Sequence, residues 1–270
     1  MTNITPAQAP ASAGAPVSES KPARVKKIVI LGATSGIVLE VERQLAHRRR
    51  ELLLVARSPQ RLAALQADLL IRGASQVLIY SADLSSIPQH NGILEFARRE
   101  FPDFDTVLLA YGSMHGQKDS ENSIEVLLEE LQVDFVSAAA ILTLFAAELE
   151  RRREGCIAAI TSVAGDRGRR SNYVYGSAKG GLSLFLQGLR SRLHPAGVRV
   201  ITIKPGPVQT PMTDGLPNAA LFADPQHVAH DIVGSLERRS PDVLYTPRIW
   251  RYIMAAVKLV PETIFKRLPL

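Results

Sequence analysis

The sequence predicts an α/β fold in which a doubly wound parallel sheet carries helices on both faces. Three observations support this prediction. Short apolar segments typical of buried strands alternate with longer segments of helical periodicity from residue 27 to residue 246. The helical segments are long enough for the right-handed crossovers that join parallel strands. A chain of 270 residues, 46% of them hydrophobic and 21% charged, can also bury a large core.

The alternation predicts a sheet of about seven strands within one domain, residues 25–247. The second helix illustrates its boundaries, because Pro59 stands near its start and Gly73 just past its end, where these residues are favoured. The expected strands are 27–31, 51–56, 76–80, 105–110, 156–161, 198–204 and 242–246. The expected helices are 36–49, 59–72, 87–100, 121–131, 134–153, 172–193 and 225–238.

Composition limits what the rest of the chain can be. Residues 1–24 are rich in Pro and Ala, contain no apolar segment of the kind found in signal peptides, and are predicted to be disordered. No apolar run reaches the roughly 18 residues of a transmembrane helix, so a cytoplasmic protein is expected. The single cysteine, Cys156, excludes an internal disulfide and is expected in the core; no metal site is predicted.

Positive charge is concentrated at the C-terminal end of the chain. The net charge is +6, but residues 248–270 hold five basic residues against Glu262 alone, and residues 25–247 are almost neutral. This distribution argues against nucleic acid as a partner. It indicates instead that residues 248–270 form an extension that faces a membrane or a protein partner.

Residues 248–259 are predicted to form an amphipathic helix. Arg248, Arg251 and Lys258 fall within an arc of about 80° on a helical wheel, and apolar residues cover the other side. This pattern is typical of a helix lying in a membrane interface. Packing against another subunit, or over a substrate cleft as a lid, explains the same pattern, and these interpretations are compatible with one another.

The first strand is followed by a turn with two glycines. In the segment ILGATSGIVLE, Gly32 and Gly36 bracket Thr34 and Ser35 between a strand and a helix. Glycine permits a sharp turn and a close approach to phosphate, and the start of the helix offers free N–H groups to a pyrophosphate. A simple tight turn would use the same residues, and the spacing differs from the usual G-x-G-x-x-G pattern.

The end of the second strand indicates which dinucleotide would bind. NAD-selective sites place an acidic residue there to hold the ribose 2′-hydroxyl. Here the strand ends with Arg57 and Ser58, and a guanidinium suits a 2′-phosphate. We therefore expect NADP(H), with NAD(H) as the alternative; Arg57 could also be an ordinary surface arginine.

Residues 158–181 contain the pattern with the most chemical content. Ser162 ends the fifth strand, Tyr175 follows 13 residues later, and Lys179 lies one helical turn beyond it. An ammonium beside a phenol favours the phenolate, so the pKa of Tyr175 is predicted to be lowered. Such a tyrosine can exchange a proton with a carbonyl or alcohol oxygen that Ser162 also binds.

These residues resemble the short-chain dehydrogenase/reductase family over about residues 26–247. The family's marks occur in order as Gly32-x-x-x-Gly36, Asp83, Ala110-Tyr111-Gly112, Ser162, Tyr175-x-x-x-Lys179 and Pro205-Gly206-Pro207-Val208-x-Thr210. The resemblance implies a Rossmann-type fold, with Tyr175 as acid/base, Lys179 on the nicotinamide ribose and Ser162 on the carbonyl. It further implies that the cofactor contacts Gly32, Thr34, Ser35, Gly36, Ile37, Arg57, Ser58, Asp83, Leu84, Ala110, Gly112, Tyr175, Lys179, Pro205, Gly206, Val208 and Thr210.

Three positions depart from the family pattern. Val38 replaces a third glycine, Ala110-Tyr111-Gly112 replaces Asn-Ala-Gly, and Asp134 stands where a relay asparagine is usual. Asp134 could still hold a water in a proton relay, and it is a candidate catalytic residue. The departures leave a second hypothesis open, a non-catalytic NADP(H)-binding protein or sensor.

The substrate is predicted to be a ketone, with two clues to its class. Arg167, Arg169 and Arg170 lie between Ser162 and Tyr175, where arginine could bind a phosphate, and His115 follows the fourth strand near the expected cleft. Residues 160–212 and 245–270 also resemble reductases of a keto-sugar carried on a polyprenyl phosphate. The resemblance thus implies a lipid-linked keto-sugar and peripheral contact with the inner face of the membrane, with a soluble carbonyl substrate as the alternative.

A homodimer or homotetramer is also expected. The helical segments 134–149 and 177–189 are apolar over unusually wide faces, which suggests that they pack against another subunit as well as against the sheet.

Overall fold

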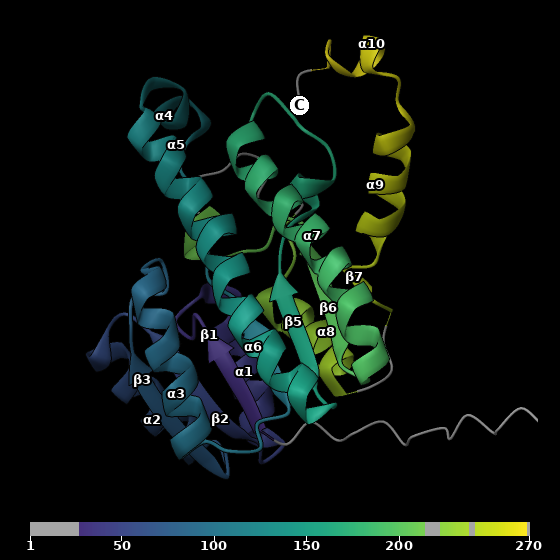
Figure 1. The fold of residues 1–270 in the computed structure, drawn as a ribbon. Helices are drawn as coiled ribbons and strands as arrows, with labels where there is room; N and C mark the ends of the chain where they lie inside the picture. The colour runs from purple at the N-terminus through teal and green to yellow at the C-terminus, as the bar shows by residue number, and fades with distance from the viewer. Residues whose placement is uncertain (1–26, 214–221, 238–240, 269–270) are drawn as a thin grey trace, which may run out of the picture.

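The computed structural model describes residues 27–213, 222–237 and 241–268. Its centre is a parallel sheet of seven strands in the order β3-β2-β1-β4-β5-β6-β7, which confirms the predicted fold class (Figure 1). The strands are β1 Lys27–Leu31, β2 Glu51–Ala56, β3 Gln76–Ser81, β4 Thr106–Leu109, β5 Cys156–Ile160, β6 Arg199–Pro205 and β7 Val243–Thr246. The predicted disorder of residues 1–24 lies outside the described residues.

Helices cover both faces of the sheet (Figure 1). One face packs against α1 (Gly36–His47), α2 (Pro59–Ile71) and α8 (Pro225–Glu237), and the other against α3 (His90–Glu100), α6 (Ala138–Arg152) and α7 (Tyr173–Leu193). Alternate residues of each strand point to opposite faces, so that Ile28 and Ile30 join the first core and Val29 and Leu31 the second. Each fully buried aliphatic side chain of this kind contributes about 1.5–3 kcal/mol.

Cys156 is in the first core, as predicted, and is only 3% exposed. Burial raises the pKa of its thiol to about 12. A thiol in this environment is a small apolar side chain and not a nucleophile.

The structure differs from the sequence prediction in one long helix. A break was predicted between residues 131 and 134, but α5 (Ile124–Leu131), a π-helical turn (Gln132–Ser137) and α6 form one continuous helix. No Pro or Gly interrupts this stretch, and the wider π turn accommodates the change of helical phase that resembled a break. The 29 residues Ile124–Arg152 are long and apolar enough to cross a membrane, but their buried face belongs to the second core.

The C-terminal extension forms two helices beside the carboxyl ends of the strands. They are α9 (Ile249–Leu259) and α10 (Glu262–Phe265), and Figure 1 shows them standing above β6 and β7. On the opposite side of the same end stand α4 (Gln117–Asn122) and α5. Helices α9 and α10 therefore flank the carboxyl end of the sheet on one side, and α4 and α5 flank it on the other.

Candidate active site

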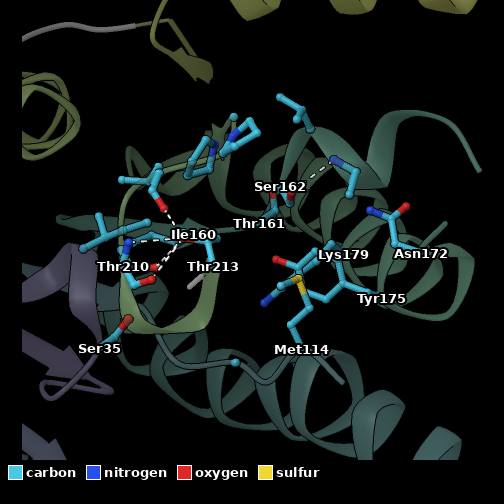
Figure 2. Close-up of a pocket in the computed structure, with 18 of the residues that line it drawn as sticks. Ser35, Met114, Ile160, Thr161, Ser162, Asn172, Tyr175, Lys179, Thr210 and Thr213 are labelled. Carbon is cyan, nitrogen blue, oxygen red and sulfur yellow. Dashed lines mark hydrogen bonds between the residues drawn. The ribbon is translucent and has the colours of Figure 1, made fainter. Parts of the chain in front are cut away.

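An open cleft lies at the carboxyl ends of β1, β4, β5 and β6. Chain order reverses between β1 and β4, and in sheets of this topology that is where ligands bind. Figure 2 shows Ser35, Thr210 and Thr213 on one side of the cleft, with Met114, Ser162, Asn172, Tyr175 and Lys179 on the other.

The turn after β1 is shaped by Gly32, whose φ of +99° is rarely adopted by other residues. The N–H groups of Gly32 and Ala33 both donate to the carbonyl of Val55, at 2.9 and 3.1 Å, which ties the turn to the end of β2. Ser35 is the N-cap of α1 and makes no side-chain capping bond. The first N–H groups of α1 are therefore left to bind an anion at the helix's positive end.

Val38, the departure at the start of α1, is fully buried in the first core and does not line the cleft. Its bulk therefore points away from the space in front of the turn.

Two arginines stand near the Gly turn. Arg57 follows β2 and is exposed, and it lies close enough to Asp83 to help lower the pKa of that carboxyl, after the larger effect of the Ser85 hydroxyl. Arg61, which the sequence interpretation missed, reaches from α2 and donates to the carbonyl of Thr34 at 3.3 Å. Ser58 caps α2 by accepting the Arg61 N–H at 3.3 Å. The side of the turn next to β2 is thus positively charged.

Tyr175 and Lys179 project into the cleft from the first two turns of α7, as their spacing predicts (Figure 2). The Lys179 Nζ lies 5.7 Å from the centre of the Tyr175 ring. Ser162 lies two residues after β5, and its Oγ accepts the Ala164 N–H at 3.1 Å, which leaves its hydroxyl hydrogen to be donated. The Ser162 hydroxyl can donate this hydrogen either to the Tyr175 oxygen or to the carbonyl oxygen of a ligand in the cleft.

The predicted direction of the Tyr175 pKa is wrong. Burial raises the pKa of Tyr175, and this outweighs the opposing effects of the Lys179 charge and the Ser162 hydroxyl. Lys179 is less effective than expected because its Nζ forms a buried ion pair with Asp134 Oδ1 at 3.0 Å, and the Asp134 charge itself favours the protonated phenol. In this environment Tyr175 holds its proton and is suited to donating it.

Asp134 comes from the π-helical turn and is fully buried. Its Oδ1 also accepts the backbone N–H of Ser113 at 3.0 Å. Burial raises the pKa of Asp134, while the Lys179 ammonium opposes this increase. Gly112 makes room for the pair, since a side chain at that position would collide with the Asp134 carboxylate and the Lys179 ammonium.

The far end of the cleft carries two polar side chains without partners among the described residues. Arg169 lines the cleft with its Nε buried, and burial lowers the pKa of its guanidinium. Asn172 lines it beside Tyr175, with its Oδ1 also buried. Buried polar atoms normally have partners, so these two mark a place for a polar ligand.

Arg167 has a different role from the predicted phosphate contact. It donates to the carbonyls of Val257 and Val260, both at 2.6 Å, pairs with Glu262 at 3.0 Å, and stacks on the Phe265 ring at 3.8 Å. The guanidinium thus satisfies the last carbonyls of α9 and holds α9 and α10 against the loop that carries Ser162.

The extension also forms one wall of the cleft. Trp250 lines the cleft, and its indole lies so close to Gly206 that no side chain would fit there. Met254 and Phe265 are buried, whereas Ile249, Tyr252, Ile253 and Leu259 are exposed. Part of the predicted apolar face therefore packs against the domain beside the cleft, as a lid would. The rest of that face is exposed to solvent.

The cleft gathers more than half of the predicted site residues. Those that line it are Ser35, Ile37, Ala110, Gly112, Ser162, Arg169, Tyr175, Lys179, Pro205, Gly206, Val208 and Thr210. Gly32, Thr34, Gly36, Arg57, Ser58, Asp83, Leu84, His115, Asp134 and Arg170 lie around it without lining it. Met114, Asn172 and Trp250 also line it and were not predicted.

The fold and this arrangement define an oxidoreductase of the short-chain dehydrogenase class. A family model described as short chain dehydrogenase matches residues 26–220, and the chain belongs to this family. An uncharacterized oxidoreductase of Mycobacterium tuberculosis is 33% identical over 242 residues, which cover 90% of this chain and 96% of the relative.

Solved structures share the same fold. A short-chain dehydrogenase from Burkholderia cenocepacia in complex with NADP superposes with a TM-score of 0.78 at 18% identity, covering 92% of this chain and 99% of the other. L-Sorbose reductase from Gluconobacter frateurii, complexed with NADPH and L-sorbose, gives 0.73 at 21% identity, with coverages of 82% and 94%. At these identities the likeness concerns the fold.

Proposed function

We propose that the protein is an NADPH-dependent ketoreductase. The observation that carries this proposal is the placement of Tyr175 beside Ser162 and Lys179, in a cleft whose opposite wall begins at the Gly32–Gly36 turn. Burial raises the pKa of Tyr175, which favours the protonated phenol that a reduction needs. The uncapped start of α1 fits a pyrophosphate, and Arg57 and Arg61 fit a 2′-phosphate, with NAD(H) as the weaker alternative. NADP(H)-bound members of the family with the same fold support the choice of cofactor.

Each residue has a defined part in the proposed reaction. NADPH, when bound, supplies the hydride. The Ser162 hydroxyl donates a hydrogen bond to the ketone oxygen, and Tyr175 transfers its proton to that oxygen as negative charge develops there. Lys179 holds positive charge beside the phenolate that remains. Pro205–Thr210, at the end of β6, would hold the nicotinamide amide, and Asp83 and Leu84 would border the adenine.

The substrate class follows from the polar end of the cleft. Arg169 can bind a phosphate, and the Asn172 carbonyl oxygen can accept a hydrogen bond from a hydroxyl. Trp250 offers an aromatic wall to a sugar ring or an apolar chain. We infer a keto-sugar carried on a polyprenyl phosphate. The resemblance of residues 160–212 and 245–270 to decaprenylphosphoryl-2-keto-pentose reductase supports this inference.

Peripheral contact with a membrane is part of the same proposal. The exposed Ile249, Tyr252 and Ile253 lie beside exposed Arg251 and Lys258, at the mouth of the cleft. Each basic residue near anionic lipid contributes about 1 kcal/mol, so the cytoplasmic protein would bind the inner face of the membrane reversibly. Arg251→Glu with Lys258→Glu should abolish salt-sensitive binding to anionic vesicles, and unchanged binding would refute the contact.

A homodimer or homotetramer is proposed on the outer faces of α6 and α7. Leu184 of α7 is 68% exposed, and Val136, in the π-helical turn that leads into α6, is 42% exposed. Light scattering of the wild type and of Leu184→Glu would test this arrangement, which predicts smaller particles for the variant.

An NADPH-consumption screen tests the function directly. The panel should contain phosphorylated and lipid-linked keto-sugars together with soluble ketones. Turnover of the first group supports the full proposal, and turnover of soluble ketones alone restricts it to a soluble carbonyl substrate. Saturable NADPH binding without turnover of any ketone would favour the alternative, a cofactor-binding sensor, which the Lys179–Asp134 pair makes worth testing.

A further inference from the structure

Behind the proposed catalytic residues lies a cluster of buried polar side chains. Four neighbouring atoms in it have no partner in the part of the chain that the structure describes, namely Ser113 Oγ, His115 Nε2, Glu130 Oε1 and Asp134 Oδ2. Native proteins leave few buried polar atoms unpaired, and those that occur in groups are commonly bridged by ordered water. A group of unpaired buried polar atoms beside Lys179 therefore indicates a functional role for this cluster.

The elements of the cluster are fixed by contacts on each side. Glu130 and Asp134 lie one turn apart on the long helix and are 1% and 0% exposed. Glu130 Oε2 accepts the Ser120 hydroxyl at 3.2 Å, and the backbone N–H of His115 lies close enough to the same carboxyl to lower its pKa. Asp134 in turn accepts the N–H of Ser113 and holds Lys179. The loop that carries Ser113 and His115 therefore lies against the carboxyls of both Asp134 and Glu130.

His115 is the member of the cluster that connects it to solvent. Its side chain is half-buried, with Nε2 inside, and its charge acts on both Asp134 and Glu130. The titratable groups that face Asp134 are Lys179 and Tyr175 from α7, Tyr111 and His115 from the segment after β4, and Glu130 from its own helix. An imidazole in this position can take a proton from water and pass it inward.

We propose that His115, Glu130 and Asp134 are positioning residues that return a proton to Tyr175 after each reduction. This inference rests on the proposed ketoreductase function. Tyr175 loses its O–H proton to the product oxygen; the Lys179 ammonium then gives one N–H proton to the phenolate. His115, protonated by solvent, then passes a proton to the Asp134 carboxylate through the intervening polar atoms, and the Asp134 carboxyl passes that proton to the neutral Lys179 amine. One proton enters from solvent for each proton that leaves in the alcohol.

Glu130 keeps the path oriented. Its carboxyl is fixed by the Ser120 hydroxyl and lies near the backbone N–H and the imidazole of His115, whose charge also lowers the pKa of Glu130 against the larger effect of burial. The usual family asparagine at position 134 could not carry a proton in this way. The replacement of asparagine by Asp134 thus allows proton transfer, and this transfer depends on His115 and Glu130.

The first test is His115→Ala in the full-length protein, with His47→Ala, an exposed histidine at the end of α1, as the control. We expect turnover to fall about tenfold, less than the roughly hundredfold effect of losing the direct acid. The KM values should not change, the solvent isotope effect on kcat should rise, and added imidazole should restore the rate. A His115→Ala variant with an unchanged isotope effect and no rescue by imidazole would overturn the proposal.

Asp134→Asn tests the first step through the pH profile. The Asp134 charge raises the pKa of Tyr175, and reduction needs the protonated phenol, so the rate falls as the pH rises through that pKa. Removing the charge should move this fall to lower pH. A profile with the same inflection as the wild type would disconnect Asp134 from Tyr175 and contradict the path.

A measurement without substrate separates this proposal from the proposed function. Nitrogen-15 NMR of labelled lysine reports how fast the Lys179 ammonium protons exchange with water. We expect several-fold slower exchange in His115→Ala, restored by imidazole, and no change in His47→Ala. This result would support the path even if no ketone were reduced. Equal exchange in His115→Ala and wild type, in an enzyme that does reduce ketones, would refute the path alone.

Discussion

The part of the cleft next to β1, β2 and β3 is assembled from local turns, whereas the part beyond β4 depends on residues far apart in the sequence. In the first part, Ser58 accepts the Arg61 N–H and the Ser85 hydroxyl folds back on Asp83. In the second, Arg167 holds the carbonyls of Val257 and Val260. Local turns produce recognisable spacings, and long-range contacts do not. The cofactor side was therefore predictable as a pattern, whereas on the substrate side only Ser162, Tyr175 and Lys179 were, and the wall formed by the C-terminal extension was not.

A buried polar network extends the long-range part beneath the Ser162 loop. Asp166 pairs with Lys204 of β6 and accepts the Tyr245 hydroxyl of β7 at 2.7 Å. The next residue, Arg167, holds the C-terminal extension. Neighbouring residues thus connect the loop to the sheet on one side and to the lid-like helices on the other, and the loop's shape depends on both attachments.

The largest loss of turnover should come from changing Tyr175, which lies between the cofactor side and the substrate side of the cleft. Tyr175→Phe removes the proposed acid but no cofactor contact that depends on charge, so turnover should fall at least roughly a hundredfold while NADPH affinity is kept. Stopped-flow NADPH oxidation and cofactor fluorescence measure the two quantities. Tyr173→Phe, on the exposed side of the same helix, is the matched control. Retained turnover in Tyr175→Phe would refute its assignment.

Detaching the C-terminal helices α9 and α10 from the domain should weaken substrate binding and leave cofactor binding intact. Arg167→Ala removes two hydrogen bonds to carbonyls, an ion pair and a stacking contact, together worth about 2 kcal/mol after the surface pair is discounted. We expect faster amide exchange over residues 249–265 and a higher KM for the ketone, with NADPH affinity unchanged. Arg170→Ala, at an exposed position in the same loop, should leave both quantities unchanged. Weaker NADPH binding in Arg167→Ala would show that the two parts are coupled.

The cofactor side can be tested with its two arginines. Arg57→Ala and Arg61→Ala should each raise the Kd for NADPH about tenfold, equivalent to about 1.4 kcal/mol, because each loses a charge facing the 2′-phosphate. The Kd for NADH should barely move. Isothermal titration with both cofactors measures this, with Arg72→Ala at the far end of α2 as the control. An equal loss for both cofactors would make these arginines structural.

A smaller effect concerns stability away from the cleft. Glu42 of α1 is fully buried, its carboxyl oxygens have no partner among the residues described, and burial raises its pKa well above the usual range. A raised folded-state pKa gives stability that is present below about pH 4, the unfolded value, and is lost as the pH rises through the folded value.

Glu42→Gln should therefore gain stability relative to wild type as the pH rises, by about 1 kcal/mol. Thermal unfolding at pH 5 and at pH 8 measures the change. Glu40→Gln, which removes a partner of Arg43 on the same helix, should show no such gain. A constant difference between Glu42→Gln and wild type at both pH values would mean that Glu42 is not titrating.

The sequence predicted the seven strands because their apolar runs are short and bounded by turn residues. It also predicted that Ser162, Tyr175 and Lys179 would meet, since strand ends and helical spacing determine their positions. It did not predict the raised pKa of Tyr175, because that depends on burial and on the Lys179–Asp134 contact across two helices. Nor did it place Trp250 in the cleft, since the helix that carries it is fixed by the contact between Arg167 and Phe265, which are far apart in the sequence.

The most direct test of the account is substrate preference for a phosphate. The kcat/KM for a phosphorylated keto-sugar should exceed that for the same sugar without phosphate by at least about tenfold, because a charged hydrogen bond contributes roughly 1.5–3 kcal/mol. Arg169→Gln should erase the preference and leave the neutral sugar's kcat/KM unchanged. Equal kcat/KM values for the two sugars in the wild type, or a preference that survives in Arg169→Gln, would contradict it.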